Sequence, residues 1–413
     1  MATKRDLTIK KRRIRPEAEE QPEKKAPKKK AKKRRHGRSM LWPILFRLLL
    51  VTAVVMLGVL IWRNWDRLAP SAVVEWMDRL VTGGEGGDGY PVDITGSSVV
   101  AMEPFGSNAA VLTDTSLILY NSAGAQVVER PHTYTDPLLE RADKYLLVAE
   151  LGGTRYTLGN KSETLFTGQV SNTIRAAAVD SSGQVALATE SSQSYMSEVL
   201  VFDREGKELF HWYSADLTVI DVALTVNGKQ VAVLGLSAAG GEMKSTVQIF
   251  SLAGKQGKAD HTYTAQGPMM VALHCFGNGR VGVVGDTALW VYDPSDNTTA
   301  VTAYENSTLL GYAFSERGVG IVTRGYGESS GGTLTVVTPA GKQTAATAFS
   351  GDFRHLAAAD NGFYLLTDST LYNADTVGFA AETAATPDGL MTVEMNGKPL
   401  VLGLTTLSRC EWE

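Results

Sequence analysis

The pattern of hydrophobic and polar residues divides the chain into one long apolar run and many short ones. Residues 41–62 form an apolar stretch of 22 residues that contains one charge, Arg47. From residue 91 to residue 413, short apolar runs alternate with turns rich in Gly, Asn, Asp and Ser. The long run predicts a helix that crosses a membrane, whereas short runs between turn residues predict β-strands.

The long run has the length and the ends of a transmembrane helix. As a helix it would reach about 33 Å, enough for the hydrocarbon core of a bilayer. Trp42 lies at one end and Trp62 and Trp65 at the other, where aromatic side chains favour the interface, and Arg47 is close enough to its end to extend toward the headgroups. A cleaved signal peptide is the alternative, but neither a short basic leader nor an A-x-A-like site is present.

Charge sets the expected orientation of this helix. Residues 1–38 contain 17 Lys and Arg against 5 Asp and Glu, a net +12, so the overall charge of −4 leaves −16 for the remainder. Basic residues collect on the cytoplasmic side of such helices, which predicts a single-pass cell-membrane protein with residues 91–413 outside. Residues 1–40 should be a disordered tail that rests on anionic lipid; nucleic-acid binding is not expected, because no aromatic residues are interleaved with the basic ones.

Two short segments join the predicted helix to the rest. Residues 63–82 are predicted to be a juxtamembrane region with an amphipathic helix that starts at Ser71 and places Trp76 on the membrane interface. Residues 83–90 are rich in Gly and are predicted to form a flexible linker.

Residues 91–413 read as an all-β repeat. An apolar strand that enters a polar turn recurs at residues 119, 156, 201, 249, 291, 336 and 371, with a mean spacing of about 42 residues. That period with four strands per unit is typical of β-propeller blades. Inner strands are expected near residues 97, 138, 172, 217, 268, 308, 353 and 389, which favours eight blades, with seven as the alternative. Val92–Thr95 is expected to supply the missing outer strand of the last blade and so close the ring.

The order of these segments carries a resemblance. A basic tail, a single span, an amphipathic helix, a Gly-rich linker, the segment Gly89-Tyr-Pro-Val-Asp-Ile-Thr-Gly-Ser97 and quinoprotein-like or WD40-like blades follow one another. This arrangement resembles an uncharacterised family of membrane-anchored propeller proteins from Gram-positive anaerobes, described only as a domain of unknown function. The resemblance implies a surface location and a fold, and it implies no activity.

Motifs that would indicate catalysis or cofactor binding are explained by turns. Gly277–Gly282 fits a dinucleotide pattern and Gly327–Gly331 a nucleophile elbow, but each lies between strands rather than before a helix. Asp293–Asn297 lacks the ligand spacing of a calcium loop. The domain also lacks the repeated Trp motifs and adjacent Cys pair of propellers that bind pyrroloquinoline quinone, so no cofactor is expected.

Metal and disulfide chemistry are not expected either. None of the six His stands in a two-ligand spacing on one strand, and His274 is expected to pack near the centre. Cys275 and Cys410 fall in blades five and eight, too far apart for a disulfide.

Surface loops remain as the candidate site. Three connections between the second and third strands of a blade are expected to be enlarged, around Ser191–Ser197, Ser237–Ser245 and Arg324–Gly332, all on one face. Their candidate partner-binding residues are Tyr195, Met196, Glu242, Met243, Arg324, Tyr326 and Glu328. The sequence thus predicts a non-enzymatic scaffold or sensor for an extracytoplasmic protein or cell-envelope polymer. Two alternatives stay open: tolerated insertions without a binding role, and a surface hydrolase or other enzyme that uses the central funnel.

Overall fold

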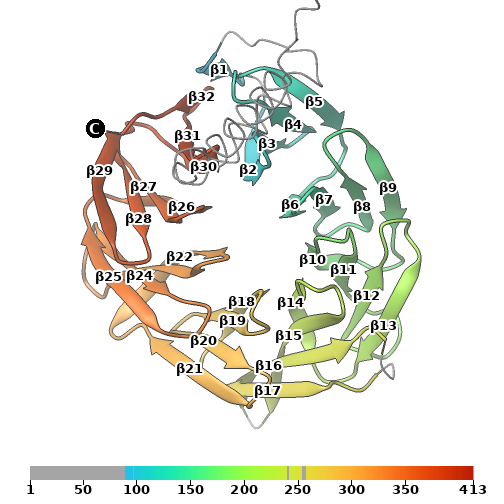
Figure 1. Cartoon of the computed structure of the whole chain (residues 1–413). Coiled ribbons are helices and arrows are strands. Elements are labelled where there is room, and N and C mark those ends of the chain that lie inside the picture. The colour runs from blue at the N-terminus through green and yellow to red at the C-terminus, as the bar shows by residue number, and fades with distance from the viewer. Residues whose placement is uncertain (1–88, 96, 240, 254–256, 413) are drawn as a thin grey trace, which may run out of the picture. The chain divides into compact units, whose positions relative to one another are not determined.

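The computed structural model describes residues 89–412 except 96, 240 and 254–256. All regular elements in this part of the chain are β-strands, and they form eight antiparallel sheets of four strands each. Figure 1 shows the sheets arranged as blades around a central axis. The prediction of an all-β propeller with eight blades is confirmed, and seven blades is wrong.

Each blade consists of four strands, which we name A to D from the axis outward. Blades one and two contain β2 (Val99–Phe105), β3 (Asn108–Thr113), β4 (Ser116–Tyr120) and β5 (Gln126–Pro131), then β6 (Pro137–Ala142), β7 (Tyr145–Glu150), β8 (Arg155–Gly159) and β9 (Thr164–Gln169). Blades three and four contain β10 (Ile174–Val179), β11 (Val185–Thr189), β12 (Ser197–Phe202) and β13 (Glu208–Ser214), then β14 (Thr218–Leu224), β15 (Gln230–Ala239), β16 (Glu242–Ser251) and β17 (His261–Gln266). Blades five and six contain β18 (Met270–Cys275), β19 (Val281–Gly285), β20 (Ala288–Asp293) and β21 (Thr298–Ala303), then β22 (Ser307–Ser315), β23 (Gly318–Gly325), β24 (Gly332–Val337) and β25 (Gln343–Phe349). Blades seven and eight contain β26 (Phe353–Ala359), β27 (Gly362–Thr367), β28 (Thr370–Asp375) and β29 (Phe379–Ala385), then β30 (Met391–Met395), β31 (Lys398–Leu402), β32 (Thr406–Arg409) and β1 (Val92–Asp93).

The eighth blade closes the ring with strands from both ends of the repeat. Its sheet has the order β30-β31-β32-β1, and Val92 pairs with Leu407 while Asp93 pairs with Thr406. This confirms the expected closure by Val92–Thr95, although only two of those residues are in the strand. The eight inner strands also begin within a few residues of the predicted positions.

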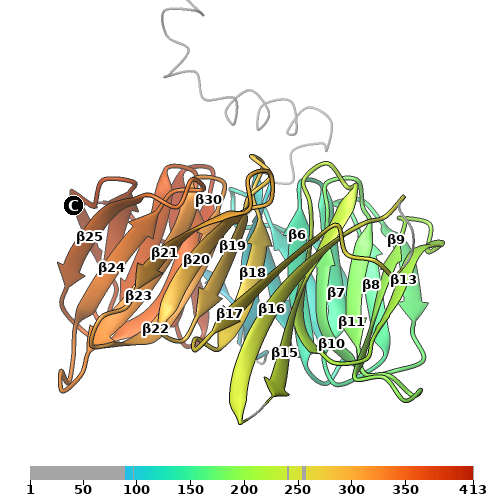
Figure 2. The same cartoon turned by 90° about the horizontal axis from the view of Figure 1, so that it is seen from below.

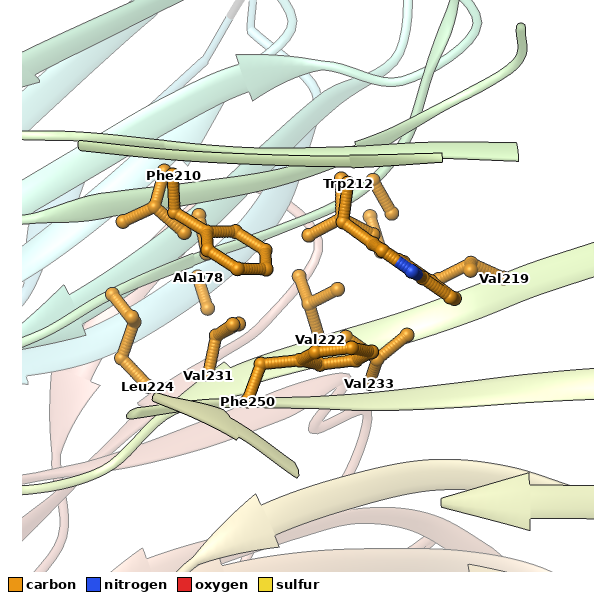
Figure 3. Close-up of a cluster of buried hydrophobic side chains, with 14 of the residues drawn as sticks. Ala178, Phe210, Trp212, Val219, Val222, Leu224, Val231, Val233 and Phe250 are labelled. Carbon is orange, nitrogen blue, oxygen red and sulfur yellow. The ribbon is translucent and has the colours of Figure 1, made fainter. Parts of the chain in front are cut away.

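The core lies between neighbouring blades. Figure 3 shows the layer between blades three and four, where Phe210 and Trp212 of β13 face Phe250 of β16. The Trp212 and Phe250 rings lie 4.7 Å apart, and the Phe210 and Phe250 rings 5.6 Å. Because each sheet packs on both sides, its middle strands are apolar at successive positions instead of alternating.

The predicted segments before residue 89 lie outside the described residues. These are the tail, the span Leu41–Trp62, the juxtamembrane helix and nearly all of the Gly-rich linker. The residues that the structure describes include no helix with the length and apolar character needed to cross a membrane.

Connections between strands lie on two faces of the propeller. The B–C connections within blades and the D–A connections between blades form what we call the loop face. The A–B and C–D connections form the opposite face, which we call the turn face. Figure 2 shows the long hairpin of β15 and β16 projecting from the loop face.

The described chain begins on the turn face. The amide of Gly89 donates to the carbonyl oxygen of Ala123, in the connection between β4 and β5, at 3.0 Å. The Tyr90 hydroxyl donates to the carbonyl oxygen of Asn121, in the same connection, at 2.9 Å. The chain therefore enters the propeller on the side opposite the loop face.

Candidate partner-binding face

The loop-face residues predicted from the sequence come from blades three, four and six. Tyr195 and Met196 lie in the connection between β11 and β12, and Tyr326 and Glu328 in the connection between β23 and β24. Glu242 and Met243 begin β16, and Arg324 is in β23. All three segments rise on one face, as expected from the repeat.

The segment in blade four differs from the prediction in its structure. Ser237–Ser245 was expected to be a connection, but β15 and β16 stay paired as far as Ala239 and Glu242. Their neighbours stop earlier, because the last pairs are Thr218 with Leu236 and Lys244 with Gln266. The end of this hairpin therefore extends beyond its sheet, with Met243 46% exposed.

Aromatic rings support the loop in blade three. Tyr195 stacks on Tyr213 of β13 with ring centroids 5.0 Å apart, and Tyr213 packs on His211 at 4.6 Å. Tyr195 remains 43% exposed at the end of this row. The row gives the loop an apolar, rigid support in an otherwise polar segment.

A histidine–carboxylate pair lies beside that row. Nε2 of His211 lies 2.5 Å from a carboxylate oxygen of Glu198, which is buried and also accepts from Asn172 and Thr189. Nδ1 of His211 lies 3.5 Å from Glu208. Because both ring nitrogens face carboxylates, neither is available to activate a neighbouring hydroxyl in this arrangement.

Two predicted contact residues in blade six hold their own loop. Nε of Arg324 donates to the carbonyl oxygen of Gly331 at 2.9 Å, and its guanidinium pairs with Asp352 at 3.2 Å. Glu328 accepts the amide of Gly325 at 3.1 Å. These contacts present Tyr326 to solvent, with 69% of its surface exposed.

Exposed apolar side chains concentrate on the loop face. The described residues include twelve exposed large hydrophobic side chains. Seven of them belong to the loop face: Tyr195, Met196, Met243, Met269, Tyr326, Leu390 and Leu404. Only Val226 and Val377 lie in connections of the turn face.

Three of those seven are not among the residues predicted from the sequence, because the prediction rests on enlarged connections. Met269 and Leu390 lie in D–A connections, and Leu404 lies in the short B–C connection of blade eight. The sequence signal that could have identified them is an apolar residue at a position of the repeat where a polar turn residue is expected.

Acidic side chains from the inner strands of three blades lie close together near the axis of the ring, in the region that we call the central channel. Glu103 of β2 and Arg141 of β6 form an ion pair at 3.2 Å. Asp221 of β14 accepts the amides of Val222 and Leu273, each at 2.8 Å. Glu140 of β6 lies near enough to both Glu103 and Asp221 for their charges to affect its ionisation.

Burial near the axis raises the pKa of these carboxyls above the ordinary values. Burial, then the charges of Glu103 and Asp221, raises the pKa of Glu140 to about 8. Burial raises the pKa of Asp221 to about 6, against its two amide donors. The pKa of Glu103 is also raised by burial, which outweighs the attraction of Arg141, although 39% of the Glu103 side chain contacts solvent in the open channel.

His274 packs near this channel, as the sequence predicted. Its ring stacks on Phe314 at 5.1 Å and meets the edge of Phe276 at 5.2 Å. Burial lowers the pKa of His274 to about 4, so the ring is neutral near neutrality. Cys275 beside it is buried, Cys410 is partly buried, and both are free.

The motif-like segments lie in turns and loops. Gly277–Gly282 includes the turn from β18 to β19, and Gly327–Gly331 belongs to the connection from β23 to β24. Asp293 accepts from Ser295 and pairs with Arg280, so its oxygens are occupied locally. No group of three or more His, Cys, Asp or Glu in the described part of the chain is placed to hold a metal ion.

A cavity of about 350 Å³ lies between blades one and two. Leu117, Leu146 and Val148 form its apolar floor, and Thr133 and Arg130 are among its polar lining residues. It contains none of the loop-face residues named above.

Comparison with known proteins identifies a family. The model of a family of unknown function, DUF5711, matches residues 88–389, and the chain belongs to this family. The match begins at the first strand of the ring and includes seven complete blades. No curated protein matches the chain.

Solved propeller-containing structures match at low similarity. Hydrazine synthase of Kuenenia stuttgartiensis is 11% identical with a TM-score of 0.44, and covers 75% of this chain and 94% of that chain. Apo AztD from Citrobacter koseri is 10% identical with a TM-score of 0.47, over 76% of this chain and 90% of that chain. A chain of the mitotic checkpoint complex is 11% identical with a TM-score of 0.48, over 78% and 90%. At these values the likenesses say nothing about function.

Proposed function

We propose that this DUF5711 protein is a membrane-tethered, extracytoplasmic propeller that binds a protein or cell-envelope polymer through its loop face and acts as a scaffold or sensor rather than an enzyme. The observation that carries the proposal is the concentration of exposed Tyr, Met and Leu side chains on that face. Aromatic residues and Met are enriched at protein interfaces, and loops on a rigid scaffold commonly hold binding residues.

The path of the chain supports this use of the loop face. Gly89 lies on the turn face, so an anchor that precedes it would leave the opposite face free. The apolar run at residues 41–62 and the basic residues before it support a single span with the propeller outside.

A test of binding compares the two faces. We would place a photo-crosslinking residue at position 326 or, as the matched control, at position 377 on the turn face, and identify what each captures on intact cells. The combined variant Tyr195→Ser, Met243→Ser, Tyr326→Ser should then weaken binding of the purified captured molecule at least about tenfold, because exposed anchors of this kind contribute most of an interface's binding energy. The control Val226→Ser, Val377→Ser should leave it unchanged. Equal effects of the two variants would refute the proposal.

Orientation has its own test. A protease added to intact cells should cleave within residues 89–413 and leave residues 1–38 intact. Cleavage of the tail with protection of the propeller would reverse the proposed orientation.

A second candidate function is hydrolysis in the central channel. The observation that favours it is the convergence of Glu103, Glu140 and Asp221, because a carboxyl with a raised pKa can act as a general acid near neutral pH. Envelope polymers would be incubated with the full chain and with its Glu140→Gln and Asp221→Asn variants. Turnover that is lost in both variants while their thermal unfolding stays cooperative would establish an enzyme; absence of turnover in the unmodified chain would leave the channel a structural feature.

A further inference from the structure

Charge distinguishes the loop face from the turn face. The connections of the loop face contain ten acidic residues and no Lys or Arg: Asp114, Asp136, Glu190, Asp216, Asp286, Glu305, Glu328, Asp352, Asp368 and Asp388. The described connections of the turn face contain nine acidic and nine basic residues; the basic ones are Lys144, Lys161, Arg204, Lys207, Lys229, Lys258, Arg280, Arg317 and Lys342. The connections of the loop face are therefore strongly negative, whereas those of the turn face are balanced; among the strand-end residues of the loop face, Glu242 adds one negative charge and Lys244 and Arg324 add two positive charges.

Some of these loop-face carboxylates have structural partners. Asp114, Asp286 and Asp368 accept amides from neighbouring D–A connections at 3.0 to 3.3 Å. Strand residues Arg175 and Arg324 pair with Glu190 and Asp352. These contacts account for part of the negative charge only.

Four others have no such use. The side chains of Asp136, Asp216, Glu305 and Asp388 belong to exposed residues, and no hydrogen bond or ion pair engages their carboxylates within the described residues. They lie in the D–A connections that follow blades one, three, five and seven, so they are spaced around the whole ring. Nothing in the fold requires a negative charge at these four positions.

We propose, on the basis of the proposed function, that the partner bound by the loop face is a basic polypeptide segment with interspersed Lys or Arg and apolar residues. The ring of carboxylates would attract and align the cations, and such complementary charge mainly raises the association rate and selects the partner. Tyr195 and Tyr326 present exposed rings that can receive an Arg or Lys side chain, while Met243, Met269 and Leu404 contact its apolar residues. A neutral or anionic polymer would gain nothing from the carboxylates and would have to approach against their charge.

The experiment measures peptide binding to the full chain in nanodiscs of zwitterionic lipid. The probe is a 20-residue peptide of alternating Lys and Leu pairs, and its counterpart has Glu in place of each Lys. The loop-face variant Asp136→Asn, Asp216→Asn, Glu305→Gln, Asp388→Asn removes four charges. The matched turn-face variant Asp143→Asn, Glu163→Gln, Asp260→Asn, Glu316→Gln removes four charges from exposed residues of the turn face. Residues 1–38 carry a net charge of +12 and attract the Glu peptide while repelling the Lys peptide, so each peptide is compared between the unmodified chain and the two variants, in which this contribution is constant.

The expected result is that binding of the Lys peptide depends on the loop-face carboxylates, whereas neither variant weakens binding of the Glu peptide. The loop-face variant should lose about tenfold or more in affinity, and the turn-face variant less than about twofold, because screening limits each charge to its own neighbourhood. Raising salt from about 0.05 to 0.5 M should weaken binding to the unmodified chain and have less effect on the loop-face variant.

Two results would overturn the inference: a loop-face variant that weakens binding of both peptides equally, or equal losses of Lys-peptide binding in the two variants. If the Lys peptide fails while the molecule cross-linked at position 326 still depends on Tyr195, Met243 and Tyr326, the partner is not basic but the binding function stands. If both fail, the proposed function fails as well.

Discussion

The two faces of this propeller are built by the same backbone scheme and differ in what their connections contain. On the turn face, Asn and Asp side chains hold their own turns: Asp203 accepts the amides of Glu205 at 3.0 Å and Lys207 at 2.8 Å. Asn160 similarly accepts two amides in its connection. On the loop face, Asp114 and Asp286 also accept amides, but exposed Tyr and Met side chains and four carboxylates without partners among the described residues accompany them. Packing determines the strands, whereas connections are limited only by turn geometry, so the exposed side chains of the two faces can differ without any change in the strands.

The largest effect on the free energy of unfolding should come from a substitution in the core between blades, compared with one on the loop face. Phe250→Ala removes a fully buried ring that contacts Phe210 and Trp212, and should lower the free energy of unfolding by about 3–5 kcal/mol. Tyr326→Ala on the loop face should change it by less than about 0.5 kcal/mol. Urea unfolding followed by tryptophan fluorescence measures both. A large loss from Tyr326→Ala would mean that the loop is part of the core and that the distinction fails.

An intermediate effect should come from the buried carboxyls of the inner strands. Folding raises the pKa of Glu140 from its ordinary value of 4.5 to about 8, so the native state holds a proton that the unfolded state releases between those pH values. Stability from this group is thus highest below about pH 4.5 and falls as pH rises toward 8. Glu140→Gln should therefore stabilise the protein at pH 8 by about 1–3 kcal/mol and have little effect at pH 4.5.

Urea midpoints at pH 4.5, 6 and 8 test this expectation, with Glu316→Gln as an exposed control. A gain from Glu140→Gln that is the same at every pH would show that the Glu140 carboxyl is not a proton-binding group of the folded state.

The smallest effect on stability should distinguish a carboxylate that accepts two amides on the turn face from one without a partner on the loop face. Asp203→Ala removes two hydrogen bonds from a turn-face connection and should cost about 1–2 kcal/mol. Asp216→Ala on the loop face removes a carboxylate without a partner and should change stability by less than about 0.5 kcal/mol. Thermal unfolding at one pH is sufficient. Equal costs would show that the carboxylate of Asp216 also stabilises its connection.

The ring could be predicted from the sequence because each blade repeats the same local pattern. Strand starts, blade number and closure through Val92 follow from alternation of apolar runs with turns. The extent of the β15–β16 hairpin did not follow, because Gly240-Gly241 and the small residues before it suit a loop as well as a tight turn between paired strands. The pairing of β15 with β16 in the structure is what distinguishes a tight turn from a loop at this position.

The contents of the channel could not be predicted for a different reason. Glu103, Glu140 and Asp221 belong to blades one, two and four, and only closure of the ring brings their side chains together. Likewise, Arg324 and Glu328 were chosen as contact residues because they lie in a long connection. Their bonds to Gly331 and Gly325 depend on the conformation of that loop, which its composition does not specify. The binding role of the seven predicted residues stays a prediction.

The closing strand also determines how the molecule carries force. Residues 89–94 connect whatever precedes them to the ring through two residue pairs of β1 with β32, the hydrogen bonds of Gly89, Tyr90 and Ile94, and packing of Tyr90, Val92 and Ile94 on the core. Tension applied along the chain from its N-terminal side is therefore loaded on the joint that completes the circle before it reaches any whole blade. If the propeller is anchored by its N-terminal segment and pulled by a partner on the far face, the pairing of β1 with β32 is the contact that should separate first.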